Sequence, residues 1–111
     1  MDTGTVLIID DEADFSYLLK IFFLRKNCRV FLTHSLSEGI SILDSVTPDI
    51  IFLDNNLPDG MGWEKKELIL EKCPNTRLSL ISGAQFSIIP GSSFNFLEKP
   101  ITINELNRLF S

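Results

Sequence analysis

The stretch TVLIIDD, residues 5–11, is a short apolar run that ends on two adjacent aspartates. A continuous apolar run of this length, rich in β-branched residues, is typical of a strand buried on both faces of a parallel sheet. From Glu12 to Asn27 the pattern changes, because apolar side chains now recur at helical spacing. The chain therefore begins with a strand followed by a helix.

The same alternation of strand and helix continues along the chain. We expect further strands over Arg29–Thr33, Asp49–Leu53, Arg77–Ile81 and Phe94–Glu98. We expect further helices that begin after Ser35 or Ser37, span Trp63–Lys72, and begin after Thr102. Alternating strands and helices predict an α/β fold, in which helices cover both faces of a parallel sheet.

One segment departs from this alternation. Between the last two expected strands, Gly83–Ser93 contains Pro90 and Gly91 and few apolar side chains. A regular crossover helix does not fit there, and at most one helical turn around Gln85–Ile89 is expected. The fourth helix of the fold is therefore expected to be reduced or missing.

The composition predicts a single domain over residues 1–111. A chain of 111 residues with 44% hydrophobic content can bury one core but not two. Its net charge of −5 argues against direct binding to nucleic acid, which requires clustered Lys and Arg. Because there is neither a basic, apolar leader nor a membrane-spanning run, we expect a soluble cytoplasmic domain.

Charged and polar side chains follow the apolar strands. Asp10, Asp11, Asp54, Ser82 and Lys99 all come at the carboxyl ends of expected strands. An open α/β sheet binds its ligands at that edge. Carboxylates brought together there repel one another unless a divalent cation neutralises them, and oxygen ligands favour Mg²⁺ or Mn²⁺ over zinc. The pattern predicts a magnesium site that attracts an anion, although an Asp pair alone could be no more than a helix cap.

Four segments together resemble the receiver domain of bacterial two-component response regulators. They are VLIIDDE (6–12), PDIIFLD (48–54), LPDGMG (57–62) and FLEKP (96–100). The resemblance implies a flavodoxin-like, doubly wound, five-stranded parallel sheet with strand order 2-1-3-4-5. It also implies that a sensor histidine kinase or phosphotransfer protein donates a phosphoryl group, and that the modified domain switches its binding to an output protein or domain.

The resemblance implies a role for each acidic position. Asp54 matches the phosphoacceptor of the family. Asp10 and Asp11 match the acidic pair that holds magnesium, together with Asp54. Asn56 matches the residue whose backbone carbonyl completes the metal shell.

The remaining matches concern the response to phosphorylation. Ser82 corresponds to the switch hydroxyl that moves to bond the phosphoryl group, and Lys99 to the basic residue that contacts it. Phe96 corresponds to the aromatic residue whose rotamer follows activation. Pro100 corresponds to a proline that often follows the lysine through a cis bond.

Two other functions remain open on the residues alone. A degenerate receiver could keep the fold and act as a phosphorylation-independent interaction module, as the reduced fourth helix would allow. A small phosphatase-like enzyme is disfavoured, because no second acid-base residue accompanies Asp54 at a suitable spacing. We therefore expect a switch rather than an enzyme, with self-catalysed phosphoryl transfer and slow autodephosphorylation only. The apolar run Ile21–Leu24 also leaves room for a homodimer or a partner surface.

Overall fold

The computed structural model describes residues 4–83 and 95–110. Within them, one parallel sheet has five strands in the order β2-β1-β3-β6-β7. The strands are β1 (Thr5–Ile9), β2 (Arg29–Thr33), β3 (Ile50–Asp54), β6 (Arg77–Ser82) and β7 (Asn95–Glu98). The expected order 2-1-3-4-5 is confirmed, because β4 and β5 form a separate two-stranded ribbon.

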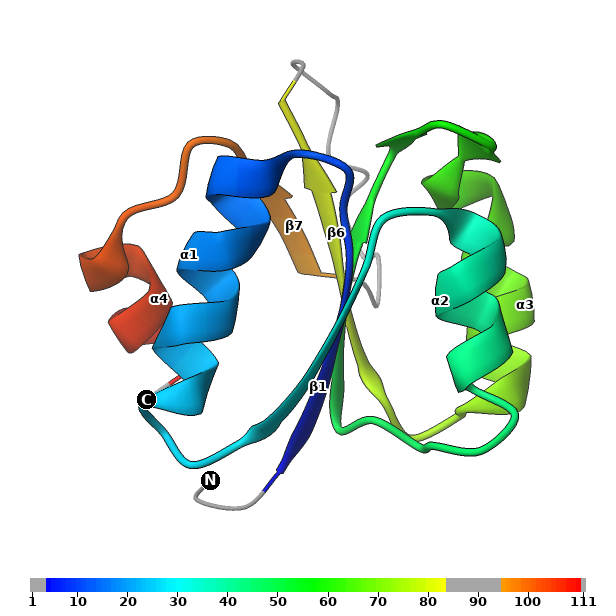
Figure 1. The fold of residues 1–111 in the computed structure, drawn as a ribbon, viewed down its shortest axis with the longest axis horizontal. Helices are drawn as coiled ribbons and strands as arrows, with labels where there is room; N and C mark the ends of the chain where they lie inside the picture. Colours follow the sequence, from blue (N-terminus) through cyan, green and yellow to red (C-terminus); the bar gives the residue numbers. More distant parts are fainter. Residues whose placement is uncertain (1–3, 84–94, 111) are drawn as a thin grey trace.

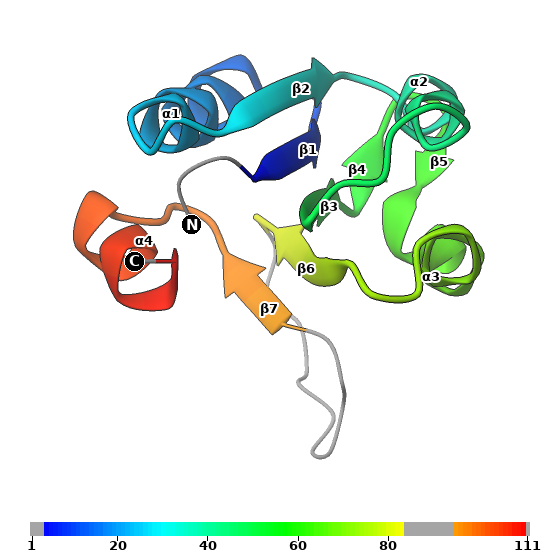
Figure 2. The ribbon, with the colours of Figure 1, turned by 90° about the horizontal axis from the view of Figure 1, so that it is seen from below.

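Helices cover both faces of the sheet, so the doubly wound architecture is confirmed. One face carries α1 (Ala13–Leu24) and α4 (Ile103–Phe110), and the other carries α2 (Leu36–Ile42) and α3 (Lys66–Lys72) (Figures 1 and 2). Each face has its own apolar core. The sheet between them is the most deeply buried part of the chain, since Ile8, Ile51 and Phe52 are fully buried.

Aromatic side chains fill the core under α1 and α4. The rings of Phe23 and Phe52 are 5.5 Å apart, and Phe110 of α4 packs against both at 5.6 and 5.3 Å. Helix α4 therefore buries an aromatic side chain against both α1 and the central strand β3, which holds α4 on the same face of the sheet as α1.

Several expected boundaries differ from the observed ones. Helix α1 spans Ala13–Leu24 rather than Glu12–Asn27, and β6 extends one residue further than expected, to Ser82. Strand β3 starts one residue later than expected and includes Asp54, because Asp54 pairs in register with Ile81 of β6. The expected turn holds the short antiparallel ribbon of β4 (Asn56–Leu57) and β5 (Gly60–Met61). The third helix opens with a 3₁₀ turn, η1 (Gly62–Lys65), before α3.

Other expectations fall outside the described residues. These are the helical turn at Gln85–Ile89, the reduced fourth helix, and the start of the last strand at Phe94. Within the described part of the chain, no helix has the length and apolar character needed to cross a membrane.

The apolar end of α1 is only partly covered. Leu24 is 44% exposed, and Ile21 lines a hollow of about 280 Å³ between α1 and α4. The expected homodimer or partner surface at this end of α1 stays a prediction.

Candidate functional site

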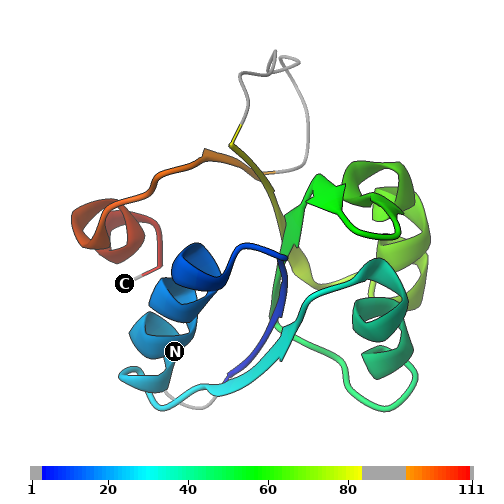
Figure 3. The same cartoon turned by 45° about the horizontal axis from the view of Figure 1, so that its top comes forward.

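The parallel strands bring their carboxyl ends to one edge of the sheet, which we call the carboxyl edge (Figure 3). Asp10 directly follows β1, and Asp54 and Ser82 are the last residues of β3 and β6. Lys99 follows β7, and its backbone N–H donates to the Ser82 carbonyl at 2.9 Å. Four of the five residues predicted to converge therefore lie at the ends of neighbouring strands, and Asp11 follows Asp10 at the same edge.

The Lys99 ammonium is the centre of this edge. Its Nζ lies 2.9 Å from Asp10 Oδ2, 2.9 Å from Glu12 Oε1 and 3.5 Å from Asp54 Oδ1. Burial works to lower the pKa of Lys99, but its hydrogen bonds to Asp10 and Glu12 outweigh that effect, and the pKa is raised. Lys99 is therefore charged, and three carboxylates face a single cation.

Asp10 is fully buried. Its Oδ1 accepts hydrogen bonds from the Glu12 backbone N–H at 2.7 Å and from Lys99 Nζ at 3.2 Å. Its Oδ2 is close to Lys99 Nζ, but the angles do not make a hydrogen bond. This buried oxygen therefore forms an ion pair with Lys99 without accepting a hydrogen bond. Burial raises the pKa of Asp10, against the opposing influence of Glu12 N–H and Lys99.

Asp54 is also buried, with 4% of its surface exposed. Burial, followed by the neighbouring charge of Asp10, raises the pKa of Asp54 to about 6, although Lys99 works in the opposite direction. Such a carboxyl is ionised at neutral pH but costs free energy in that state. A bound cation would relieve this cost.

A hollow of about 230 Å³ opens onto Asp54. Its walls are formed by Asp11, Glu12, Asp54, Asn56, Gly83 and Lys99. Asp11 is exposed at this hollow, whereas Asp10 lies beneath it, so the two members of the predicted pair differ sharply in burial. The hollow gives a ligand direct access to the Asp54 carboxylate.

The donors at this edge suit a hard divalent cation. No group of three His, Cys, Asp or Glu side chains stands ready to hold a metal among the residues that the structure describes. Mg²⁺ does not need such a group, since it commonly binds one or two carboxylates and completes its shell with water and phosphate oxygens. The unbonded Oδ2 of Asp10 and the oxygen donors of Asp54 and Asn56 meet that requirement.

The ribbon after Asp54 is fixed by side chains that the sequence analysis did not single out. Asp59 accepts hydrogen bonds from the backbone N–H groups of Leu36 and Ser37 at 2.8 and 2.9 Å, which lowers the pKa of Asp59. Asn55 Oδ1 accepts from the Trp63 N–H at 3.2 Å. The segment that carries Asn56 is thus bonded both to α2 and to η1.

Glu12 was also missed as a site residue. Its position directly after the aspartate pair was the available signal, but its role depends on a lysine 87 positions away in the chain. Ser82 lies buried at the end of β6, and the half-buried ring of Phe96 packs edge-on against Trp63 at 5.8 Å. The switch roles of Ser82 and Phe96 stay predictions, whereas the cis bond between Lys99 and Pro100 is confirmed.

Similar folds occur in solved response regulators. The chain superimposes with a TM-score of 0.84 on a two-component response regulator from Clostridium difficile, which is 24% identical, covering 96% of this chain and 91% of that one. A response regulator protein from Burkholderia pseudomallei was solved with a phosphorylated aspartic acid, a calcium ion and citrate. It gives a TM-score of 0.81 at 20% identity, and the match covers 97% of this chain and 66% of that one.

Curated relatives are longer proteins. Response regulator protein PilR of Pseudomonas aeruginosa is 27% identical over 98% of this chain and 26% of its own length. The DNA-binding transcriptional regulator NtrC of Proteus hauseri is 25% identical over 95% of this chain and 23% of its own length. This chain therefore spans about a quarter of the length of either relative.

The family model described as the response regulator receiver domain matches residues 6–110, nearly the whole chain. Except for Thr5, the first residue of β1, the match covers the five strands of the main sheet, and it includes Asp10, Asp11, Asp54, Ser82 and Lys99. The chain belongs to the receiver domains of two-component response regulators.

Proposed function

We propose that Asp54 accepts a phosphoryl group from the phosphohistidine of a sensor histidine kinase or a phosphotransfer protein, and that the product switches the binding of an output protein or domain. One observation gives this proposal its strongest support. The Asp54 carboxylate is buried yet opens onto a hollow, with the Lys99 ammonium 3.5 Å away. That geometry gives a nucleophile together with a charge that stabilises an incoming phosphoryl group.

The transfer needs little covalent chemistry from the rest of the chain. An Asp54 oxygen attacks phosphorus in line, a P–O bond forms, and the P–N bond to the donor imidazole breaks. The imidazole nitrogen keeps the electron pair of that bond and takes up a proton. Lys99 stabilises the negative charge on the transferred oxygens.

We propose Mg²⁺ as the cofactor. Asp10, Asp54, the Asn56 backbone carbonyl and Asp11, the last directly or through water, would hold it at the carboxyl edge. Bound there, the ion neutralises charge on the phosphoryl oxygens. The excess of carboxylates over ammonium groups and the unbonded Asp10 Oδ2 support this assignment.

The relatives support the wider setting. The Burkholderia pseudomallei protein carries a phosphorylated aspartic acid and a calcium ion, and NtrC is a DNA-binding transcriptional regulator. We propose that this chain acts in the cytoplasm as the receiving part of such a signalling protein. In this proposal it is a substrate that catalyses its own phosphorylation, rather than an enzyme that turns over a metabolite.

The test is to add acetyl phosphate with Mg²⁺ and to follow intact mass. We expect one added phosphoryl group, which Asp54→Asn and removal of Mg²⁺ each prevent. Trp63 fluorescence, recorded as beryllofluoride and Mg²⁺ are added, gives a second readout, because Trp63 contacts Phe96 and donates through Nε1 to the Leu53 carbonyl next to Asp54.

The opposite result has a specific meaning. If neither mass nor fluorescence changes under these conditions, the phosphoacceptor proposal is wrong, and the interaction-module function takes its place. Steady release of phosphate from an ester would instead favour the phosphatase-like enzyme.

A further inference from the structure

The Lys99 ammonium lies against an aromatic ring as well as against carboxylates. Its Nζ is 4.8 Å from the ring centroid of Phe15, in the first turn of α1. The Lys99 side chain is 11% exposed and Phe15 is 7% exposed, so little water reaches the contact. Lys99 is thus enclosed by negative oxygens on one side and by a ring face on another.

A ring face attracts a cation because the aromatic quadrupole places negative charge above the ring. The attraction is larger when the pair is desolvated, as it is here. Lysine has a flexible four-carbon stem, so its ammonium stays at one point only if several groups hold it there. A ring does this without adding a further negative charge to an edge that already has three carboxylates.

We propose that Phe15 is a positioning residue that holds the Lys99 ammonium where it meets the phosphoryl group on Asp54. This inference rests on the proposed function of Asp54. When a phosphoryl group or a cation engages the carboxylates, the contact of Lys99 with Asp10 and Glu12 is partly given up, while the ring remains. Phe15 then limits how far the ammonium can move from Asp54.

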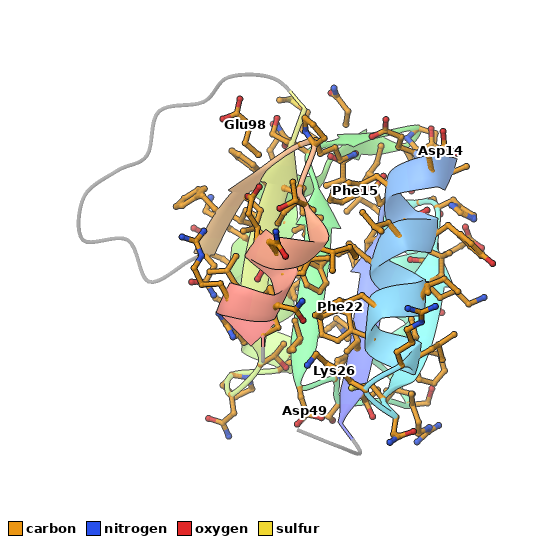
Figure 4. The ribbon with its side chains drawn as sticks, turned by 90° about the vertical axis from the view of Figure 1, so that its left-hand side faces the viewer. Asp14, Phe15, Phe22, Lys26, Asp49 and Glu98 are labelled. Carbon is orange, nitrogen blue, oxygen red and sulfur yellow. The ribbon has the colours of Figure 1, made fainter. Side chains whose placement is uncertain are left out.

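The same helix offers a matched comparison. Phe22 is also 7% exposed, belongs to the same core, and has the ammonium of Lys26 over its ring at 5.2 Å. Figure 4 shows both phenylalanines on the side of α1 that faces α4, with Lys26 at the end of the helix remote from the carboxyl edge. Loss of either ring removes core packing, but only Phe15 touches the site lysine.

The sharpest test changes the ring's charge and leaves its shape. Phenylalanine at position 15 is replaced by 4-fluoro-, 3,5-difluoro- and 3,4,5-trifluorophenylalanine, and the rate of phosphorylation by acetyl phosphate is measured at fixed Mg²⁺. Each fluorine weakens the quadrupole, so the rate should fall stepwise, by roughly 3- to 10-fold for the last member. Phe15→Tyr keeps the ring face and should remain near the original rate.

A second readout needs neither phosphate nor metal. Proton resonances of the Lys99 ε-methylene should lie upfield of the position typical of a lysine that contacts no ring, because of the Phe15 ring, with Lys99→Arg used to assign them. Phe15→Leu should abolish the shift, and Phe22→Leu should leave it unchanged.

Two results would overturn the inference. One is an unshifted Lys99 resonance in the unmodified protein, and the other is equal phosphorylation rates across the fluorinated series. Both leave the role of Asp54 intact, because Asp54 would still be modified in every variant. If Asp54→Asn is phosphorylated as fast as the original protein, the proposed function fails instead.

Discussion

Strand β3 has an aspartate at each end, and the two are used in opposite ways. Asp49 precedes the strand, is exposed, and accepts the Thr5 N–H through Oδ2 at 2.8 Å. Its backbone N–H donates to the Thr5 carbonyl and its carbonyl accepts from Arg77, so the residue ties β1, β3 and β6 together. Asp54 ends the strand and is buried. Figure 4 labels Asp49 at the lower edge of the sheet, opposite Glu98 at the carboxyl edge.

The difference shows what separates a structural carboxylate from the proposed phosphoacceptor. Asp49 lies at the opposite edge, where the strands begin, which we call the amino edge. Its exposed side chain is open to water and accepts a backbone N–H, so this carboxylate costs little folding free energy and helps to join the strands. At the carboxyl edge, burial and the neighbouring charge of Asp10 raise the pKa of Asp54, and the opposing influence of Lys99 and of the Asn55 backbone N–H does not offset them. A bound cation would lower this electrostatic cost, which makes Asp54 suited to respond to a ligand.

Breaking the carboxyl edge should have the largest effect. Lys99→Met removes the counter-charge of two buried carboxylates and should lower the free energy of unfolding at pH 7 by about 3 kcal/mol. The loss should shrink at pH 5, because Asp54, whose pKa is raised to about 6, takes up a proton in the folded state as the pH falls. Urea unfolding at both pH values measures this.

The control for that variant is Lys72→Met, which breaks the exposed ion pair with Asp44 at 3.1 Å. It should change stability by less than about 0.5 kcal/mol at either pH. Equal losses in the two variants would mean that the carboxyl edge carries no special electrostatic cost.

Gly62→Ala should test how tightly the chain packs behind Asp54. A Cβ at position 62 would collide with the backbone carbonyl oxygen of Asp54, so either the ribbon or the strand end must move. We expect about 2 kcal/mol of destabilisation and slower phosphorylation of Asp54. Gly83→Ala, whose nearest neighbour would be Lys99 Cδ at 3.9 Å, should leave the stability unchanged, and equal destabilisation by both variants would contradict the packing argument.

Asp54→Asn should stabilise the protein at pH 7. The folded-state pKa of about 6 exceeds the ordinary 3.8, so the ionised carboxylate costs free energy that the amide does not. We expect a gain of about 1 to 2 kcal/mol, smaller at pH 5, because the folded wild-type protein takes up its proton as pH falls through 6. Thermal unfolding at both pH values tests it, and a destabilised Asp54→Asn protein at pH 7 would refute the direction of the shift.

Asp49→Ala should have the smallest effect. It removes one exposed hydrogen bond at the amino edge and should cost about 1 kcal/mol or less, since water can replace the bond. Phosphorylation by acetyl phosphate should proceed at the original rate. A slower rate would show that the two ends of β3 are coupled.

Local patterns in the sequence are sufficient to predict the sheet. Runs such as Leu7–Ile9 and Ile50–Leu53 are apolar throughout because both faces of a central parallel strand are buried, so each strand is visible without its neighbours. The ribbon around Asn56 was missed, because two pairs of residues form too short a pattern to distinguish from a turn. Asp54 was placed just outside its strand for a related reason, since its pairing with Ile81 is not a local property.

The acidic and basic groups of the site also follow from sequence, because a parallel sheet brings every strand's carboxyl end to one edge. Asp10, Asp54 and Lys99 were therefore predicted together before any distance was known. Glu12, Asp59 and Phe15 could not be predicted, because each acts through a contact with a residue distant in the chain.

The sequence by itself determined the order of strands and helices, the edge at which the ligand-type residues gather, and the type of ion that suits them. Only the tertiary structure decided that Asp10 is buried while Asp11 is exposed, that Lys99 contacts three carboxylates, and that a Phe15 ring encloses it. The reason is that the order of strands along the sequence sets which residues follow the strands and so meet at the carboxyl edge of the sheet. How strongly these residues interact depends on their burial and on the distances between their side chains, which only the folded chain sets.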